Sequence, residues 1–73
     1  MGKRLNLIAF RVKHGLKQAE MAQICKVGLS TYHFMEVGKT DGKLKAWDAL
    51  KEHFKLTGEE ICELQQIQRI QES

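Results

Sequence analysis

The stretch LKQAEMAQICKVGLSTYHFMEVGK, residues 16–39, is the most informative part of the chain. Its first part predicts a helix from Gln18 to about Cys25, because the apolar residues there share one helical face. A short break containing a glycine follows, and a second helix is predicted from near Leu29 to near Glu36. Two short helices joined by a tight turn therefore occupy the middle of the chain.

The second of these helices has a predicted inner side and a predicted outer side. Tyr32 and Met35 have the spacing of inward residues, which leaves Leu29 and Phe34 facing outward. The alternative is a rotated helix in which Phe34 is buried and Tyr32 is exposed. In the turn before the helix, Lys26 stands where glycine would favour a left-handed backbone conformation.

Three further helices are predicted around this pair. In the fourth helix, an apolar stripe is formed by Leu44, Trp47, Leu50 and Phe54, and its place in that stripe predicts that Trp47 is a core residue. Thr57 followed by Glu60 has the pattern of a capping box at the start of the fifth helix. The predicted ranges are Arg4–Lys13 for the first helix, Leu44–Phe54 for the fourth, and Thr57 to the C-terminus for the fifth.

The apolar residues of the fifth helix advance by three positions and so drift around it by about 60° per step. Ile61 and Leu64 are expected to reach the core, whereas Ile67 and Ile70 are not. The stripe from Leu64 to Ile70 is therefore the candidate contact of a homodimer through the C-terminal helix. A frayed terminal helix is the alternative interpretation.

Length and composition limit the classes of function. A chain of 73 residues forms one small domain, which leaves little room for a deep catalytic pocket and argues against an enzyme. A hydrophobic content of 42% without proline is typical of a folded helical domain. The apolar runs are shorter than the ~18 residues of a membrane span, and the N-terminus lacks the features of a signal peptide. We therefore expect a cytoplasmic protein without membrane association.

The cysteines and histidines do not have the spacing of a metal site, so no metal and no cofactor is predicted. Cys25 and Cys62 both have apolar neighbours, and we expect two buried, reduced thiols. Charge is unevenly distributed: residues 1–56 have a net charge of +6, and residues 57–73 have a net charge of −3. The basic part suits a polyanion, although a modest lysine excess is also common on a solvated surface.

The sequence resembles the phage Cro and repressor (Xre-like) helix-turn-helix family. The resemblance runs without gaps through residues 16–39, including LKQAEMA, and continues through LKAWDALKEHFKLTGEEI at 44–61. It implies an all-α, five-helix, lambda-repressor-like DNA-binding domain with a central helix-turn-helix. The single domain would span residues 1–73, with its core at about 4–64 and a C-terminal helix extension at 65–73.

The same resemblance implies roles for particular residues. Arg11 and Glu36 would form a partly buried ion pair between the first and third helices. Gln18 would bind a phosphate at a helix N-terminus. Lysines in and after the following loop would contact the DNA backbone: Lys39, Lys43 and Lys45. The positions that face base edges, or lie beside them, are occupied by Leu29, Ser30, Thr31, His33 and Phe34.

The leading hypothesis is therefore a DNA-binding transcriptional regulator that binds operator DNA, as a dimer, with its third helix in the major groove. The reading helix departs from the family because Leu29 and Phe34 cannot form hydrogen bonds to bases. Together with Val37, they also suit a protein-binding surface. The alternative is a small antirepressor or modulator that binds a repressor protein and masks its DNA-binding surface.

Overall fold

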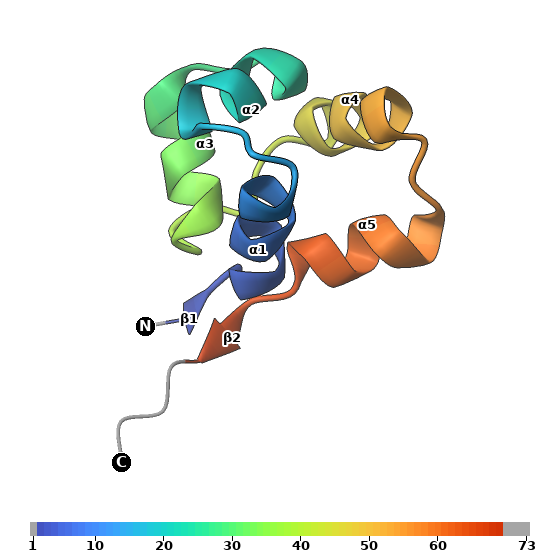
Figure 1. Cartoon of the computed structure of the whole chain (residues 1–73). Helices are drawn as coiled ribbons and strands as arrows, with labels where there is room; N and C mark the ends of the chain where they lie inside the picture. Colours follow the sequence, from blue (N-terminus) through green and yellow to red (C-terminus); the bar gives the residue numbers. More distant parts are fainter. Residues whose placement is uncertain (1, 70–73) are drawn as a thin grey trace.

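The structure is a computed structural model that describes residues 2–69. In that part of the chain, five helices enclose one apolar core and two short strands pair beside it (Figure 1). The elements are β1 (Gly2–Lys3), α1 (Leu5–Lys13), α2 (Gln18–Cys25), α3 (Leu29–Glu36), α4 (Leu44–Phe54), α5 (Gly58–Gln65) and β2 (Gln68–Arg69).

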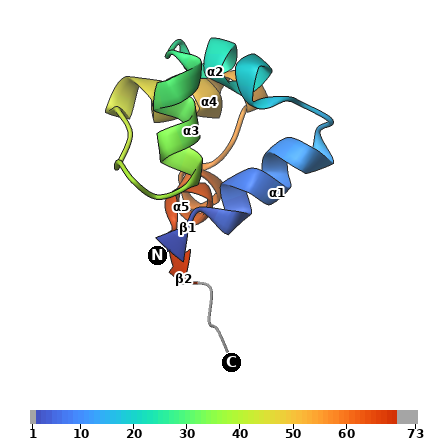
Figure 2. The same cartoon turned by 90° about the vertical axis from the view of Figure 1, so that its left-hand side faces the viewer.

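The helices are arranged around α1, which lies between the α2–α3 pair and α5 in Figure 1. Helix α4 packs against α2, and α5 packs against α1. In the view of Figure 2, α3 is at the front of the molecule, with α2 and α4 behind it. The buried apolar side chains come from all five helices: Leu7, Met21, Ala22, Cys25, Tyr32, Met35, Ala46, Trp47, Leu50 and Leu64.

Several local predictions are confirmed. Tyr32 and Met35 are fully buried, so the alternative rotation of the third helix is wrong. Lys26 has the left-handed backbone conformation, with φ 60° and ψ 40°. The capping box is present because Thr57 Oγ1 accepts a hydrogen bond from the Glu60 N–H at 3.2 Å. The Glu60 carboxylate in turn accepts from the Thr57 N–H at 3.0 Å.

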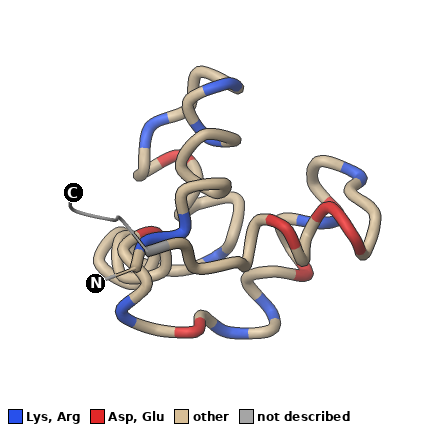
Figure 3. Tube along the Cα trace, turned by 90° about the horizontal axis from the view of Figure 1, so that it is seen from below, with Lys and Arg blue, Asp and Glu red and all other residues tan. Residues whose placement is uncertain are grey.

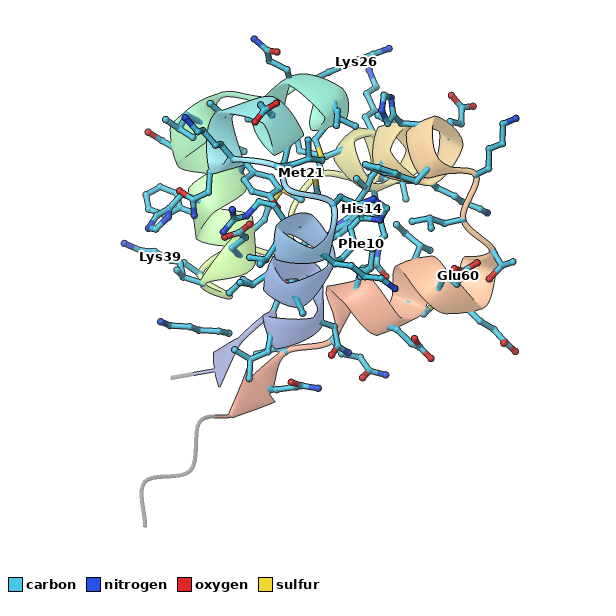
Figure 4. All side chains as sticks on the ribbon, in the orientation of Figure 1. Phe10, His14, Met21, Lys26, Lys39 and Glu60 are labelled. Carbon is cyan, nitrogen blue, oxygen red and sulfur yellow. The ribbon has the colours of Figure 1, made fainter. Side chains whose placement is uncertain are left out.

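Aromatic rings hold α1 against α4 on the side away from α3. The Phe10 ring meets the Phe54 ring edge to face, with centroids 4.9 Å apart. His14 lies 4.4 Å from Phe10 and 4.9 Å from Phe54. Figure 4 shows Phe10 and His14 close together at the end of α1. This contact holds the C-terminal end of α1, from which the chain continues to α2.

The prediction that the fifth helix reaches the C-terminus is wrong. Helix α5 ends at Gln65, and Gln66 has an extended backbone with φ −64° and ψ 134°. Strand β2 then pairs antiparallel with β1, with Gly2 opposite Arg69 and Lys3 opposite Gln68. The expected helical extension at 65–73 is therefore absent after Gln65: residues 66–67 are extended or irregular, Gln68–Arg69 form a strand, and residues 70–73 lie outside the described residues.

The end of α5 is determined by side chains from the start of the chain. In a continuing helix, the Glu63 and Gln65 carbonyl groups would accept hydrogen bonds from residues four positions later. Instead, Asn6 Nδ2 donates to the Glu63 oxygen at 3.0 Å, and Arg4 Nε donates to the Gln65 oxygen at 3.0 Å. These tertiary contacts satisfy carbonyl groups of the last turn, and they leave the following residues free to pair with β1.

One expectation about a cysteine is also wrong, and one residue of the apolar stripe is not covered. Leu44, the first residue of α4, is 74% exposed. Cys62 is exposed, because the inward side of α5 carries Ile61 and Leu64 instead. Cys25 is buried as predicted, and this burial raises the pKa of its thiol to about 11.

None of the described helices has the length and hydropathy needed to cross a bilayer.

Candidate nucleic-acid interface

The outward side of α3 is the first component of the candidate interface. Leu29 is 52% exposed and Phe34 is 37% exposed, while Ser30 and His33 are exposed between them. Val37 directly after the helix is half-buried. Tyr32 and Met35 fix this orientation by occupying the core on the opposite side. The sequence-predicted base-facing residues are therefore accessible on one side of one helix.

A cation covers one face of the Phe34 ring. The ammonium nitrogen of Lys39 lies 4.9 Å from the ring centroid, which is the geometry of a cation–π contact. The His33 ring is a further neighbour, with its centroid 6.1 Å from that of Phe34. Phe34 is consequently not an isolated apolar side chain, because any partner that meets it also meets the positive charge of Lys39.

A hydrogen-bond network connects the core with the outer side of α3. Arg11 Nε lies 2.6 Å from Glu36 Oε2, so the ion pair that the family resemblance implied is present. Gln18 Nε2 donates to Glu36 Oε1 at 2.9 Å and approaches Nδ1 of His33 at 3.3 Å. Arg11 also donates to the Leu16 carbonyl oxygen at 2.9 Å. The network ties α1, α2 and α3 together at one point.

This network changes the role expected for Gln18. The sequence analysis assigned its side-chain amide to a phosphate; in the structure its Nε2 donates to Glu36 Oε1 and lies 3.3 Å from His33 Nδ1. The side chain of Gln18 is therefore a link between α2 and α3.

Arg4 was not identified from the sequence, although it holds the end of α3 in place. It is almost completely buried, and its Nη1 donates to the Met35 oxygen at 2.6 Å and to the Thr40 oxygen at 2.7 Å. Its Nε contacts Gln65, and its guanidinium lies 5.5 Å from the Trp47 ring centroid. Burial lowers the pKa of Arg4 from its usual value. A single arginine before the first helix has no local pattern that would have indicated these contacts.

The lysines of the predicted interface form two groups. Lys43 and Lys45 line a hollow of about 380 Å³ with Thr31 and the turn residue Lys26. Lys39 lies at the other end of α3, where it lines a hollow of about 320 Å³ between that end and the terminal strands. The structure thus brings Thr31 together with two of the predicted lysines, and it places Lys39 apart from them. Sequence reasoning missed Lys26 because it was considered only as a turn residue.

The second hollow is mainly apolar. Val37 and Ile67 form its apolar lining, and Lys3 and Lys39 supply charge at its rim. Gly38 has a φ of +75°, and a Cβ there would lie 2.5 Å from the Gly2 carbonyl oxygen. The close approach of β1 to the end of α3 therefore requires glycine at position 38.

Most acidic residues of the described part of the chain lie on α4 and α5, and Figure 3 shows several of them on the right of that view. Glu20, Glu36 and Asp41 are the exceptions, on α2, on α3 and in the loop between Lys39 and Lys43. In Figure 4, Lys26 and Lys39 project outward from the part of the molecule built from α2 and α3. Glu60 lies at the start of α5, on the other side. The charge asymmetry of the sequence is therefore also an asymmetry in space.

A buried hydroxyl group lies directly behind the candidate interface. Tyr32 is fully buried, and its hydroxyl oxygen has no hydrogen-bond partner among the described residues. Burial raises the pKa of this hydroxyl, and the neighbouring Glu36 carboxylate raises it further. A buried polar group without a partner costs free energy on folding, so we expect this hydroxyl to destabilise the domain.

We therefore expect Tyr32→Phe to stabilise the protein by about 1 kcal/mol, because it removes the unpaired hydroxyl and keeps the ring. Urea unfolding followed by circular dichroism would measure the difference. Tyr32→Leu is the control, since it also lacks the hydroxyl but loses part of the packing, and it should be destabilising. A Tyr32→Phe variant that is less stable than the wild type would show that the hydroxyl forms a favourable interaction.

Comparison of this chain with known protein-family models, curated proteins and solved structures finds no match.

Proposed function

We propose that this chain is a DNA-binding transcriptional regulator of the phage Cro and repressor type, with a lambda-repressor-like fold and α3 in the major groove of operator DNA. One observation carries the proposal: the outward side of α3 is exposed at Leu29 and Phe34, with three lysines near the start of the helix and Lys39 near its end. An α-helix with its side chains is about 10–12 Å wide, which fits a major groove about 12 Å wide.

The lysine groups suit the two phosphate strands that border the groove. Lys26, Lys43 and Lys45 lie around the hollow beside the start of α4, and Lys39 lies at the end of α3. When lysines neutralise phosphates, counterions are released and the affinity falls as salt increases. The acidic part at α4 and α5 would face away from the DNA. This function also places the protein in the cytoplasm.

Two copies on a palindromic operator would place their α3 helices about 34 Å apart, one turn of the duplex. The dimer contact predicted on a C-terminal helix is not part of this proposal. Leu64 is buried in the core of its own domain, Ile67 follows the end of α5, and Ile70 lies outside the described residues. A dimer on DNA would therefore use another surface.

The test is binding to random-sequence duplex DNA, measured by fluorescence anisotropy over a series of salt concentrations. We expect log Kd to rise steeply with log salt, with a slope of about 0.9 per neutralised phosphate. Lys39→Ala and Lys43→Ala should each lower this slope by about one unit or less. Lys51→Ala is the matched control, because Lys51 is an exposed lysine of α4 away from both lysine groups, and its slope should equal that of the wild type.

A binding curve that does not respond to salt would contradict the proposal. An unchanged slope in both the Lys39→Ala and the Lys43→Ala variants would remove these residues from the interface while leaving DNA binding itself intact.

The second candidate function is an antirepressor that binds a repressor protein. The mainly apolar hollow lined by Val37 and Ile67 favours this alternative, because it could receive an apolar side chain of a partner protein at the end of α3. Such a protein would bind duplex DNA weakly at all salt concentrations, and Phe34→Ala would abolish its complex with the repressor. The salt series described above therefore distinguishes the two functions.

A further inference from the structure

The exposed apolar residues of α3 are unusual for a surface that would meet DNA. Base edges in the major groove present hydrogen-bond donors and acceptors, and the 5-methyl group of thymine is the apolar feature among them. Leu29 and Phe34 cannot donate or accept hydrogen bonds. If they lie in the groove, they gain affinity by covering methyl groups.

The charges around these residues favour DNA over an apolar protein surface as the partner. The Lys39 ammonium lies over the Phe34 ring, so a partner that covers Phe34 must also accommodate a cation. An apolar protein surface would have to remove this charge from water, which is costly. A DNA groove bordered by phosphates stabilises the charge while its floor offers methyl groups to the ring.

The positions of the two residues on the helix define the pattern that they would read. Leu29 is the first residue of α3 and Phe34 lies five positions later, so the helical repeat of 100° per residue places them at the two margins of the outward side. The polar residues Ser30 and His33 lie between them and are exposed. The outward side therefore has a polar centre with an apolar residue at either margin.

We propose that Leu29 and Phe34 make this surface a reader of 5-methylpyrimidines, thymine or 5-methylcytosine, in the major groove. This inference rests on the proposed function and adds the base chemistry that the surface recognises. Each methyl group removed from water should increase the affinity roughly fourfold, and two methyl groups should increase it by roughly tenfold or more.

The test compares duplexes that differ only in the 5-methyl group. Alternating poly(dA-dT) duplex should bind more tightly than poly(dA-dU) duplex of the same length at the same salt concentration. Poly(dG-dC) duplex containing 5-methylcytosine should likewise bind more tightly than its unmethylated counterpart. Anisotropy gives the affinities, and both comparisons leave the phosphate backbone unchanged.

Variants assign the preference to the two residues. Phe34→Ser and Leu29→Ser remove exposed apolar groups, so both variants should keep the fold, as circular dichroism would show. Each should reduce the ratio of affinities for methylated and unmethylated duplexes, and the double variant should bring the ratio to about one. Val12→Ser is the control, because Val12 is exposed on α1, and it should leave the ratio unchanged.

The possible failures are distinguishable. Equal affinities for methylated and unmethylated duplexes, with salt-dependent binding to both, would overturn the methyl-reading inference and leave the proposed function standing. A methyl preference that persists in the double variant would also overturn it. Binding to no duplex at any salt concentration would overturn both proposals and would favour a protein partner for α3.

Discussion

Replacing Arg4 with alanine is expected to lower the free energy of unfolding by about 3–5 kcal/mol, the loss typical of disrupting a buried, hydrogen-bonded charge. The Met35, Thr40 and Gln65 carbonyl groups would each lose a donor, and Trp47 would lose the guanidinium beside its ring. A chain of 73 residues is stable by about 4–11 kcal/mol in total, so the variant should be marginally folded at room temperature.

Urea unfolding would measure this loss, with circular dichroism and Trp47 fluorescence as two independent probes. Arg4→Lys separates the contribution of charge from that of geometry. Lysine keeps the charge but cannot reach three carbonyl groups in different directions, so it should restore less than half of the loss. Lys3→Ala is the control at the neighbouring exposed position and should change stability by less than about 0.5 kcal/mol. A loss of under about 1 kcal/mol in Arg4→Ala would show that the guanidinium contacts contribute little.

Removing the Glu36 carboxylate is the second substitution with a large expected effect. Glu36 is 2% exposed, and its carboxylate contacts both Arg11 and Gln18. Glu36→Ala would leave the Arg11 cation partly buried without its partner and would leave the Gln18 amide without its acceptor. We expect a loss of about 3 kcal/mol in the free energy of unfolding.

A double-mutant cycle made of Arg11→Met, Glu36→Leu and the double variant tests whether the charges act as a pair. Replacing both residues, as Arg11→Met with Glu36→Leu, should cost less than Glu36→Ala alone, because no unpaired charge remains. Glu52→Ala, at an exposed position on α4, should change stability by less than about 0.5 kcal/mol. If the losses of the two single substitutions simply add in the double variant, the pair has no coupling energy and the network does not stabilise α3.

The sequence predicted the parts of the fold that depend on local patterns. Tyr32 and Met35 were assigned to the core by their spacing on one helix, and Trp47 was assigned by its position on an apolar stripe; all three are buried. The Thr57 capping box correctly marked where a helix begins, because both of its hydrogen bonds join residues three positions apart. Such signals lie within a few residues, so a sequence shows them directly.

The end of α5 could not be predicted in the same way. The apolar spacing continues past Gln65, and neither proline nor glycine follows in residues 66–73. Where the helix ends, Arg4 and Asn6, about sixty positions earlier, bind carbonyl groups of its last turn. Contacts over such separations have no signature in the local pattern, and a single sequence does not show which distant residues meet.

The sequence predicted the part of the candidate site that depends on local helical spacing, and it did not predict the part that depends on contacts between distant residues. The outward orientation of Leu29 and Phe34 follows from helical spacing, and the structure confirms that both are exposed. The position of Lys26 beside Lys43 and Lys45 depends on how α4 packs near the turn, so the sequence alone did not indicate it.

The contacts of Arg4 also tie together segments that are far apart in the sequence. Its backbone N–H donates to the Glu36 oxygen, and its side chain binds Met35 and Thr40. The same guanidinium binds Gln65, shortly before the strand that pairs with β1. One side chain thus couples the position of α3 to the closure of the two strands, so we expect a change at either place to be transmitted to the other.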